Sequence, residues 1–134
     1  MDAGWEDAIK RGDAKDVRDL LDRGTDVDAR DRHGQTALML AAQAGRRQVV
    51  ETLIAHRPNL NATAKYGLSA LMLALVAGHA DIVRLLADAG TDLSLQGTGA
   101  PGFAGKTAYD LAVDRGMRAL SAALKPKPQA GDAR

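Results

Sequence analysis

Apolar positions recur along the chain in short groups that fit the faces of helices. Residues 37–44 read ALMLAAQA and residues 70–77 read ALMLALVA, and a glycine follows each group. Beyond each glycine comes a second apolar group, VVETLI at 49–54 and IVRLL at 82–86. Apolar residues spaced three and four apart lie on one side of a helix. The pattern therefore predicts pairs of short helices, each pair joined at a glycine.

The same pattern returns at a fixed distance. GQTALMLAAQAG at 34–45 reappears as GLSALMLALVAG at 67–78, and matching columns extend back to residue 5 and, after five extra residues, forward to residue 124. One such column holds Leu20, Leu53, Leu86 and Leu124. A helix pair of this size cannot bury its own apolar face, so a fixed period of about 20–50 residues indicates stacked repeats. We expect the leucine column to line one continuous core.

Capping residues predict where the first helices begin and end. Thr36, Ser69 and Thr107 precede the first helices, where a hydroxyl accepts hydrogen bonds from free backbone N–H groups. Gly45 and Gly78 follow them and suit the left-handed conformation that closes a helix. The polar connectors TDVDARDRHGQ (25–35) and PNLNATAKYGL (58–68) predict extended turns between successive pairs.

Together, the period, the glycine positions, the paired alanines and the Val-Val or Ile-Val of the second helices resemble ankyrin repeats. The resemblance covers about residues 5 to 125 and implies an all-α solenoid of stacked helix-turn-helix units with extended turns. It implies repeats at about 1–30, 31–63, 64–96 and 97–125, the first and last acting as caps. We expect a disordered C-terminal tail at 126–134, because KPQAGDAR is rich in Pro and charge.

One departure from the family pattern concerns the signature Thr-Pro-Leu-His. Here it reads TALM, SALM and TAYD, so Met39, Met72 and Asp110 stand where the family has a histidine. We expect a weaker polar lattice between repeats and an unchanged fold. The two methionines are interpreted as packing residues, Trp5 as the core of the first cap, and His79 as structural.

Composition excludes several function classes. The net charge is +1 with no run of Lys or Arg, which argues against nucleic-acid binding. There is no cysteine for a disulfide or thiolate metal site, and no apolar run approaches the ~18 residues that span a bilayer. The first residues lack the apolar core of a signal peptide, so we expect a cytoplasmic protein without membrane contact. A targeting segment removed before Met1 would leave no trace.

Catalytic and metal chemistry are not indicated. His33, His56 and His79 occupy three different positions of the repeat, so stacking does not bring them together as metal ligands. The segment GTGAPGFAGK (97–106) lacks the strand-to-helix context of a phosphate-binding loop. We therefore expect no enzyme activity, no catalytic residue, no metal and no cofactor.

The resemblance implies a partner on the concave surface of turn tips and first helices. The positions carried over are Arg32, His33, Gln35, Lys65, Tyr66, Leu68, Gln43 and Val76, together with Lys10, Arg11, Ala44 and Ala77. Apolar side chains at Tyr66, Leu68 and Val76 are typical of a binding hot spot. Alternatively, Leu68 packs against its neighbouring turn. Phe103, in the five-residue insertion, either covers the fourth core or projects toward a ligand.

The resulting hypothesis is a monomeric, non-catalytic interaction module that binds another protein or peptide on its concave surface. An alternative is a dedicated inhibitor or immunity-type protein that masks one partner enzyme. On the first hypothesis, replacing both Tyr66 and Leu68 by alanine should weaken binding by about 2 kcal/mol and leave stability unchanged.

Overall fold

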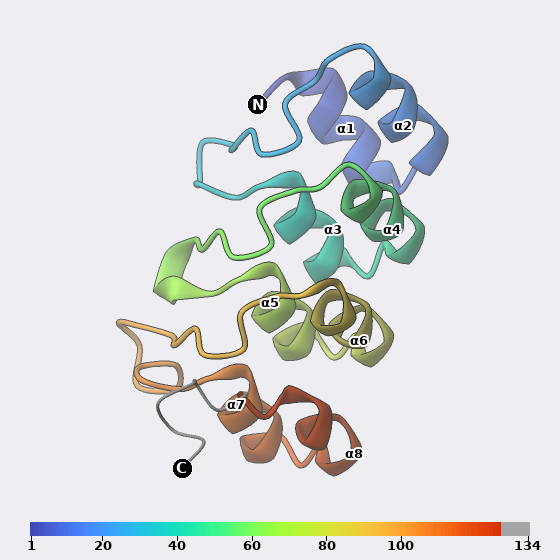
Figure 1. Cartoon of the computed structure of the whole chain (residues 1–134). Coiled ribbons are helices and arrows are strands. Elements are labelled where there is room, and N and C mark those ends of the chain that lie inside the picture. The colour runs from blue at the N-terminus through green and yellow to red at the C-terminus, as the bar shows by residue number, and fades with distance from the viewer. Residues whose placement is uncertain (127–134) are drawn as a thin grey trace, which may run out of the picture.

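The computed structural model describes residues 1–126 as four helix pairs stacked in chain order (Figure 1). The first helices and the second helices form two parallel rows. The pairs are α1 (Ala3–Arg11) with α2 (Ala14–Asp22), α3 (Ala37–Ala44) with α4 (Arg47–Ala55), α5 (Ala70–Ala77) with α6 (Ala80–Ala89), and α7 (Ala108–Asp114) with α8 (Arg118–Ser121). Successive first helices contact one another, as do α2, α4 and α6, and in the last copy α6 contacts the turn that follows α8. Two 3₁₀ turns, η1 (Lys65–Gly67) and η2 (Ala122–Leu124), complete the regular structure. The expected all-α solenoid is confirmed. Apart from Pro126, the expected disordered tail lies outside the described residues.

The first helices begin and end where the sequence predicts. The hydroxyls of Thr36, Ser69 and Thr107 each accept a hydrogen bond from the backbone N–H three residues later, at 3.3 Å. Gly45 and Gly78 close α3 and α5 with φ of 75° and 87°. These glycines take a left-handed backbone conformation that costs other residues about 1–2 kcal/mol.

A single core runs through the stack. Leu53, Leu86 and Leu124 are fully buried, and Leu20 is half-buried at the edge of the same cluster. The predicted continuous leucine column is therefore confirmed, with its first member less enclosed. In the first copy Leu21, the next residue, is the more deeply buried of the two.

The residues interpreted as packing groups lie in this core. Trp5, Met39 and Met72 are almost completely buried. Asp110, in the fourth position of the same signature, is half-buried and has a different role: its carboxylate accepts hydrogen bonds from the backbone N–H and the hydroxyl of Thr107, at 3.0 and 3.1 Å. Asp110 thus completes a capping box at the start of α7.

Polar contacts between repeats exist, but in other columns than the histidine of the family signature. The Arg46 guanidinium donates to the carbonyl oxygen of Lys10 at 2.9 Å, and Nε2 of His79 donates to that of Gln43 at 3.2 Å. The second pair lies 33 residues after the first, so the equivalent contact links copies one and two and copies two and three. The structural interpretation of His79 is supported by this contact.

The connectors form a second set of periodic contacts. The Asp28 carboxylate accepts from the backbone N–H of Asn59, and the Asn61 side-chain oxygen accepts from that of Asp92, both at 2.8 Å. These pairs also lie one repeat apart. Because each bond joins one turn to the next, the turns are held in register with the helices behind them.

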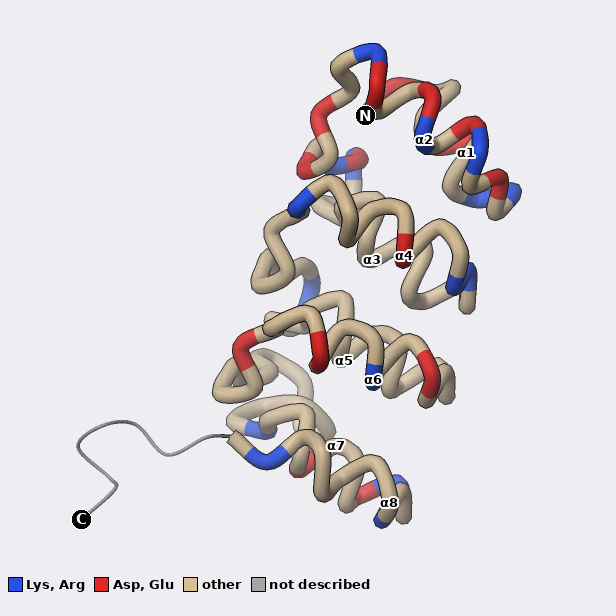
Figure 2. Tube along the Cα trace, turned by 45° about the vertical axis from the view of Figure 1, so that its right-hand side comes forward, with Lys and Arg blue, Asp and Glu red and all other residues tan. Residues whose placement is uncertain are grey.

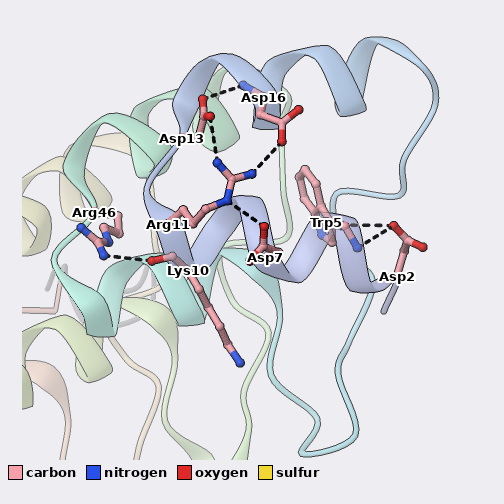
Figure 3. A network of polar contacts seen from close by, with 9 residues as sticks. Asp2, Trp5, Asp7, Lys10, Arg11, Asp13, Asp16 and Arg46 are labelled. Carbon is pink, nitrogen blue, oxygen red and sulfur yellow. Dashed lines mark hydrogen bonds and ion pairs between the residues drawn. The ribbon is translucent and has the colours of Figure 1, made fainter.

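The first copy carries charge on both helices, whereas α3 and α5 carry none (Figure 2). On its exposed side Arg11 binds three carboxylates, those of Asp7, Asp13 and Asp16, at 2.7, 3.1 and 3.0 Å (Figure 3). The hydrogen bond that Arg11 donates to the Asp7 carboxylate is the main reason that the pKa of Arg11 is raised. A charged surface of this kind suits a terminal repeat with no preceding neighbour.

Asp13 in this network predicts a pH dependence of stability. Its carboxylate caps α2 by accepting from the backbone N–H of Asp16, which, followed by the Arg11 hydrogen bond, lowers the pKa of Asp13 below its usual 3.8. A lowered folded-state pKa contributes stability above the unfolded value, and that stability is lost as the pH falls through the folded value. Asp13→Asn should therefore lose less stability than the unmodified chain when urea unfolding is compared at about pH 5 and about pH 2.

The matched control is Asp19→Asn on the same helix, since the Asp19 carboxylate has no hydrogen bond among residues 1–126. This variant should keep the acid sensitivity of the unmodified chain. If Asp13→Asn and Asp19→Asn respond alike, the cap of α2 is not the source of that sensitivity.

Candidate protein interface

The connectors that precede α3, α5 and α7 project from the same side of the stack, to the left of the row of first helices in Figure 1. We call the surface formed by these turn tips and the exposed side of the first helices the turn-side surface. Most positions proposed from the sequence lie on it. The structure separates them into two groups, one at the second copy and one at the third.

The first group lines a hollow between copies one and two. Arg32, His33 and Gln35 of the turn face this hollow together. Its volume is about 800 Å³, and its other lining residues are Met1, Glu6, Lys10, Arg30, Asp31 and Leu40. Since α1, the connector at 25–35 and α3 all contribute, the hollow exists only where two neighbouring copies stack.

Positive and negative groups in this hollow differ in how far they are already engaged. The Asp31 carboxylate accepts from the backbone N–H groups of His33 and Gln35, each at 2.9 Å, so it shapes its own turn. Glu6 lies 3.8 Å from the Lys10 ammonium. Arg32 is exposed and, within the described residues, pairs with no carboxylate. The hollow therefore offers a cation to a bound molecule while its two carboxylates are occupied.

Arg30 is a member of this hollow that the sequence analysis missed. Its guanidinium donates to the carbonyl oxygens of Gly34, at 2.7 Å, and Thr63, at 3.0 Å. It thus ties the connector at 25–35 to the connector at 58–68, and it pairs with no carboxylate among the described residues. The sequence indicates this contact only through the repeat period, because Arg30 and Thr63 lie one repeat apart.

The second group gathers around Tyr66, in the connector at 58–68. Tyr66 is 38% exposed and has a left-handed backbone, with φ of 64°. Its ring centroid lies 5.7 Å from that of Phe103, and the Lys65 ammonium lies 4.9 Å from the Tyr66 centroid. Its carbonyl oxygen accepts from the backbone N–H of Thr98 at 2.7 Å. The insertion therefore holds this turn in an unusual conformation and keeps the aromatic ring at the surface.

The insertion itself is a closed loop. Backbone hydrogen bonds of 2.9 Å join Gly97 to both Gly105 and Lys106. A side chain at Gly97 would clash with the Phe103 carbonyl oxygen, so the loop closes only over a glycine. Phe103 is half-buried and packs against both the core and Tyr66. Of the two alternatives, it therefore covers the fourth core and does not project toward a ligand.

Leu68 does not belong to this surface, and its assignment as a partner-binding residue was wrong. It is 5% exposed and packs in the core. The backbone N–H of Ala64 donates to the Leu68 carbonyl oxygen at 3.1 Å, which closes the turn. The alternative, that Leu68 packs, is the right one. Alanine at Leu68 should therefore lower stability, contrary to the expectation for the double variant.

The first helices contribute one exposed column. Lys10 of α1, Gln43 of α3 and Val76 of α5 lie one repeat apart and are all exposed, Val76 by 38%. Leu40, half-buried three residues before Gln43, lies on the same side of α3 and was also missed by the sequence analysis. Arg11 is tied to its own copy by the three carboxylates described above, so it adds little to this column.

Among residues 1–126, no group of three or more His, Cys, Asp or Glu side chains is placed to hold a metal ion. Over the same residues no helix is both long and apolar enough to cross a bilayer.

Comparison with known proteins identifies the family of this architecture. A search of curated proteins found no match to this chain. A family model described as ankyrin repeats, in three copies, matches residues 6–97. The matched residues run from within α1 to beyond the end of α6, and the fourth pair continues the same stack after them. Since the match covers more than half of the sequence, the chain belongs to the ankyrin-repeat family, whose members generally serve as protein–protein interaction modules.

Proposed function

We propose that this chain is a monomeric, non-catalytic module that binds another protein or peptide on its turn-side surface. The observation that carries the proposal is the pair of large apolar side chains exposed there, Val76 and Tyr66, each 38% accessible. Both parts of the turn-side surface also carry a cation: Arg32 lies in the hollow, and Lys65 lies beside Tyr66. Apolar anchors bordered by polar and charged groups are typical of binding hot spots.

The arrangement of the carboxylates supports a binding role over a catalytic one. A general acid or base needs a carboxyl group that is free to exchange a proton with a substrate. Asp31 is committed to backbone N–H groups and Glu6 lies beside Lys10. What the hollow presents instead is cationic and apolar side chains, which suit recognition.

The test compares two charge insertions at matched positions. Val76 and Val113 are the penultimate residues of α5 and α7, and both are exposed, by 38% and 51%. The equivalents of Val113 in the earlier copies, such as Leu75, are buried, so Val113 lies on the open end of the stack. Affinity capture from cells of the native organism, quantified by mass spectrometry, should lose its partners with Val76→Glu and retain them with Val113→Glu.

Both substitutions place the same charge on an exposed, penultimate residue of a first helix, and thermal unfolding measures whether either affects the fold. Retention of all partners by Val76→Glu would contradict the proposed surface. The captured set also separates two uses of that surface: an adaptor should retain several proteins, whereas an inhibitor or immunity-type protein should retain one in fixed stoichiometry.

A further inference from the structure

We propose that the hollow between copies one and two receives an acidic segment of the partner, an extended stretch that carries Asp or Glu side chains beside an apolar residue. The inference rests on the proposed function and adds the chemistry of the partner. It follows from which charges in the hollow are already satisfied and which are not.

The available charge is positive. Arg32 is exposed at the turn tip and Arg30 binds only carbonyl oxygens, so neither guanidinium has a carboxylate partner among the described residues. Elsewhere in the stack, Arg11 and Arg47 are each held by at least two carboxylates. Other arginines, such as Arg84, also have no ion pair among the described residues, but Arg30 and Arg32 line one hollow together and can both reach a molecule bound there.

The cationic side chains outnumber the carboxylates, since Lys10, Arg30 and Arg32 line the hollow against Glu6 and Asp31. Two backbone N–H groups already direct hydrogen bonds at Asp31, and Glu6 lies within 3.8 Å of Lys10. A guanidinium binds a carboxylate through two parallel hydrogen bonds, which gives direction as well as attraction. Carboxylates of a partner are therefore the groups that best complete this hollow.

The apolar part of the hollow explains why a peptide fits better than a lone anion. Leu40 is half-buried in its wall, and the exposed column of Gln43 and Val76 continues from it along α3 and α5. An extended segment places successive side chains on alternate sides, so acidic and apolar residues can face the hollow in turn. About 800 Å³ is ample for a few such side chains.

A nucleic acid fits this surface less well. Strong phosphate-backbone binding typically uses about 6–10 cationic contacts. Here three cations share the hollow with Glu6 and Asp31, and the chain as a whole carries a net charge of only +1. A peptide with isolated carboxylates between apolar residues matches this mixed surface. A continuous line of phosphates would be repelled by the carboxylates of Glu6 and Asp31.

The test uses two displayed peptide libraries of equal length applied to the full chain. One draws its positions from Asp, Glu and apolar residues, and the other has Asn and Gln in place of Asp and Glu. The acidic library should yield at least about tenfold more bound peptides, and its advantage should shrink at high ionic strength because exposed charges are screened.

A pair of charge reversals locates the effect. Arg32→Glu should reduce retention of the selected acidic peptides by about tenfold. Arg84→Glu on α6, another exposed arginine without an ion pair among residues 1–126, should leave it unchanged. Thermal unfolding of both variants checks that the fold is intact.

Each remaining outcome decides against the inference. Equal recovery from the two libraries, including recovery of nothing from either, overturns it. If amide-library peptides bind and Val76→Glu releases them, the interface stands and only its acidic preference fails. Tighter binding of a single-stranded DNA oligonucleotide than of any acidic peptide would assign the cations to phosphate instead.

Discussion

Leu53→Ala is expected to lower the free energy of unfolding by about 2–5 kcal/mol, the usual range for truncating a fully buried leucine. Leu53 is 0% exposed and occupies the leucine column in α4, between the half-buried Leu20 and the fully buried Leu86. In a solenoid each copy is stabilised mainly by the interfaces with its neighbours, so a cavity in the second copy weakens two interfaces. Urea unfolding followed by circular dichroism measures the loss.

Leu20→Ala is the matched control, because it makes the same truncation in the same column. Leu20 is only half-buried, so alanine there leaves a smaller cavity and should cost clearly less than at Leu53. Equal losses at Leu20 and Leu53 would mean that burial along the column does not determine stability, and that the core is not organised by the stacking described here.

Much of this fold was predictable because its constraints are local and repeated. Thr36 and Ser69 cap helices through atoms three residues away, and Gly45 and Gly78 close them through their own backbone. Each signal occurs in several copies at one spacing, so accidental matches are easily separated from real ones.

The candidate site was less predictable, because a turn position does not state which way its side chain points. Tyr66 and Leu68 are two residues apart in one turn, yet Tyr66 is exposed and Leu68 buried. The direction of each follows from the backbone hydrogen bonds of that turn, including the one between Thr98 and Tyr66. A contact with the insertion has no counterpart in the other copies, so the period carries no information about it.

The hollow shows the same limit for charged residues. The sequence places both Arg11 and Arg32 at surface positions of the family pattern, but the structure ties Arg11 to three carboxylates and leaves Arg32 free of any among the described residues. The difference depends on where Asp7, Asp13 and Asp16 lie around α1 and α2. The sequence therefore shows which positions are charged, whereas the availability of a charge to a partner depends on how the local backbone places neighbouring carboxylates around it.

Gly45→Ala is expected to destabilise the stack by about 2–3 kcal/mol, of which about 1–2 kcal/mol comes from the left-handed backbone and about 1 kcal/mol from a lost hydrogen bond. Gly45 has φ of 75°, and a methyl group on it would meet the His79 ring at 2.8 Å. That ring binds the carbonyl oxygen of Gln43, so moving it breaks the contact between copies two and three.

Gly78→Ala separates the two contributions. Gly78 closes α5 with φ of 87°, but nothing lies within 4 Å of the methyl position, so only the backbone cost of about 1–2 kcal/mol applies. In a His79→Ala background the two alanine substitutions should then cost the same, because the contact has already been removed. A difference between Gly45 and Gly78 that survives removal of His79 would show that the periodic ring-to-carbonyl contact does not couple the repeats.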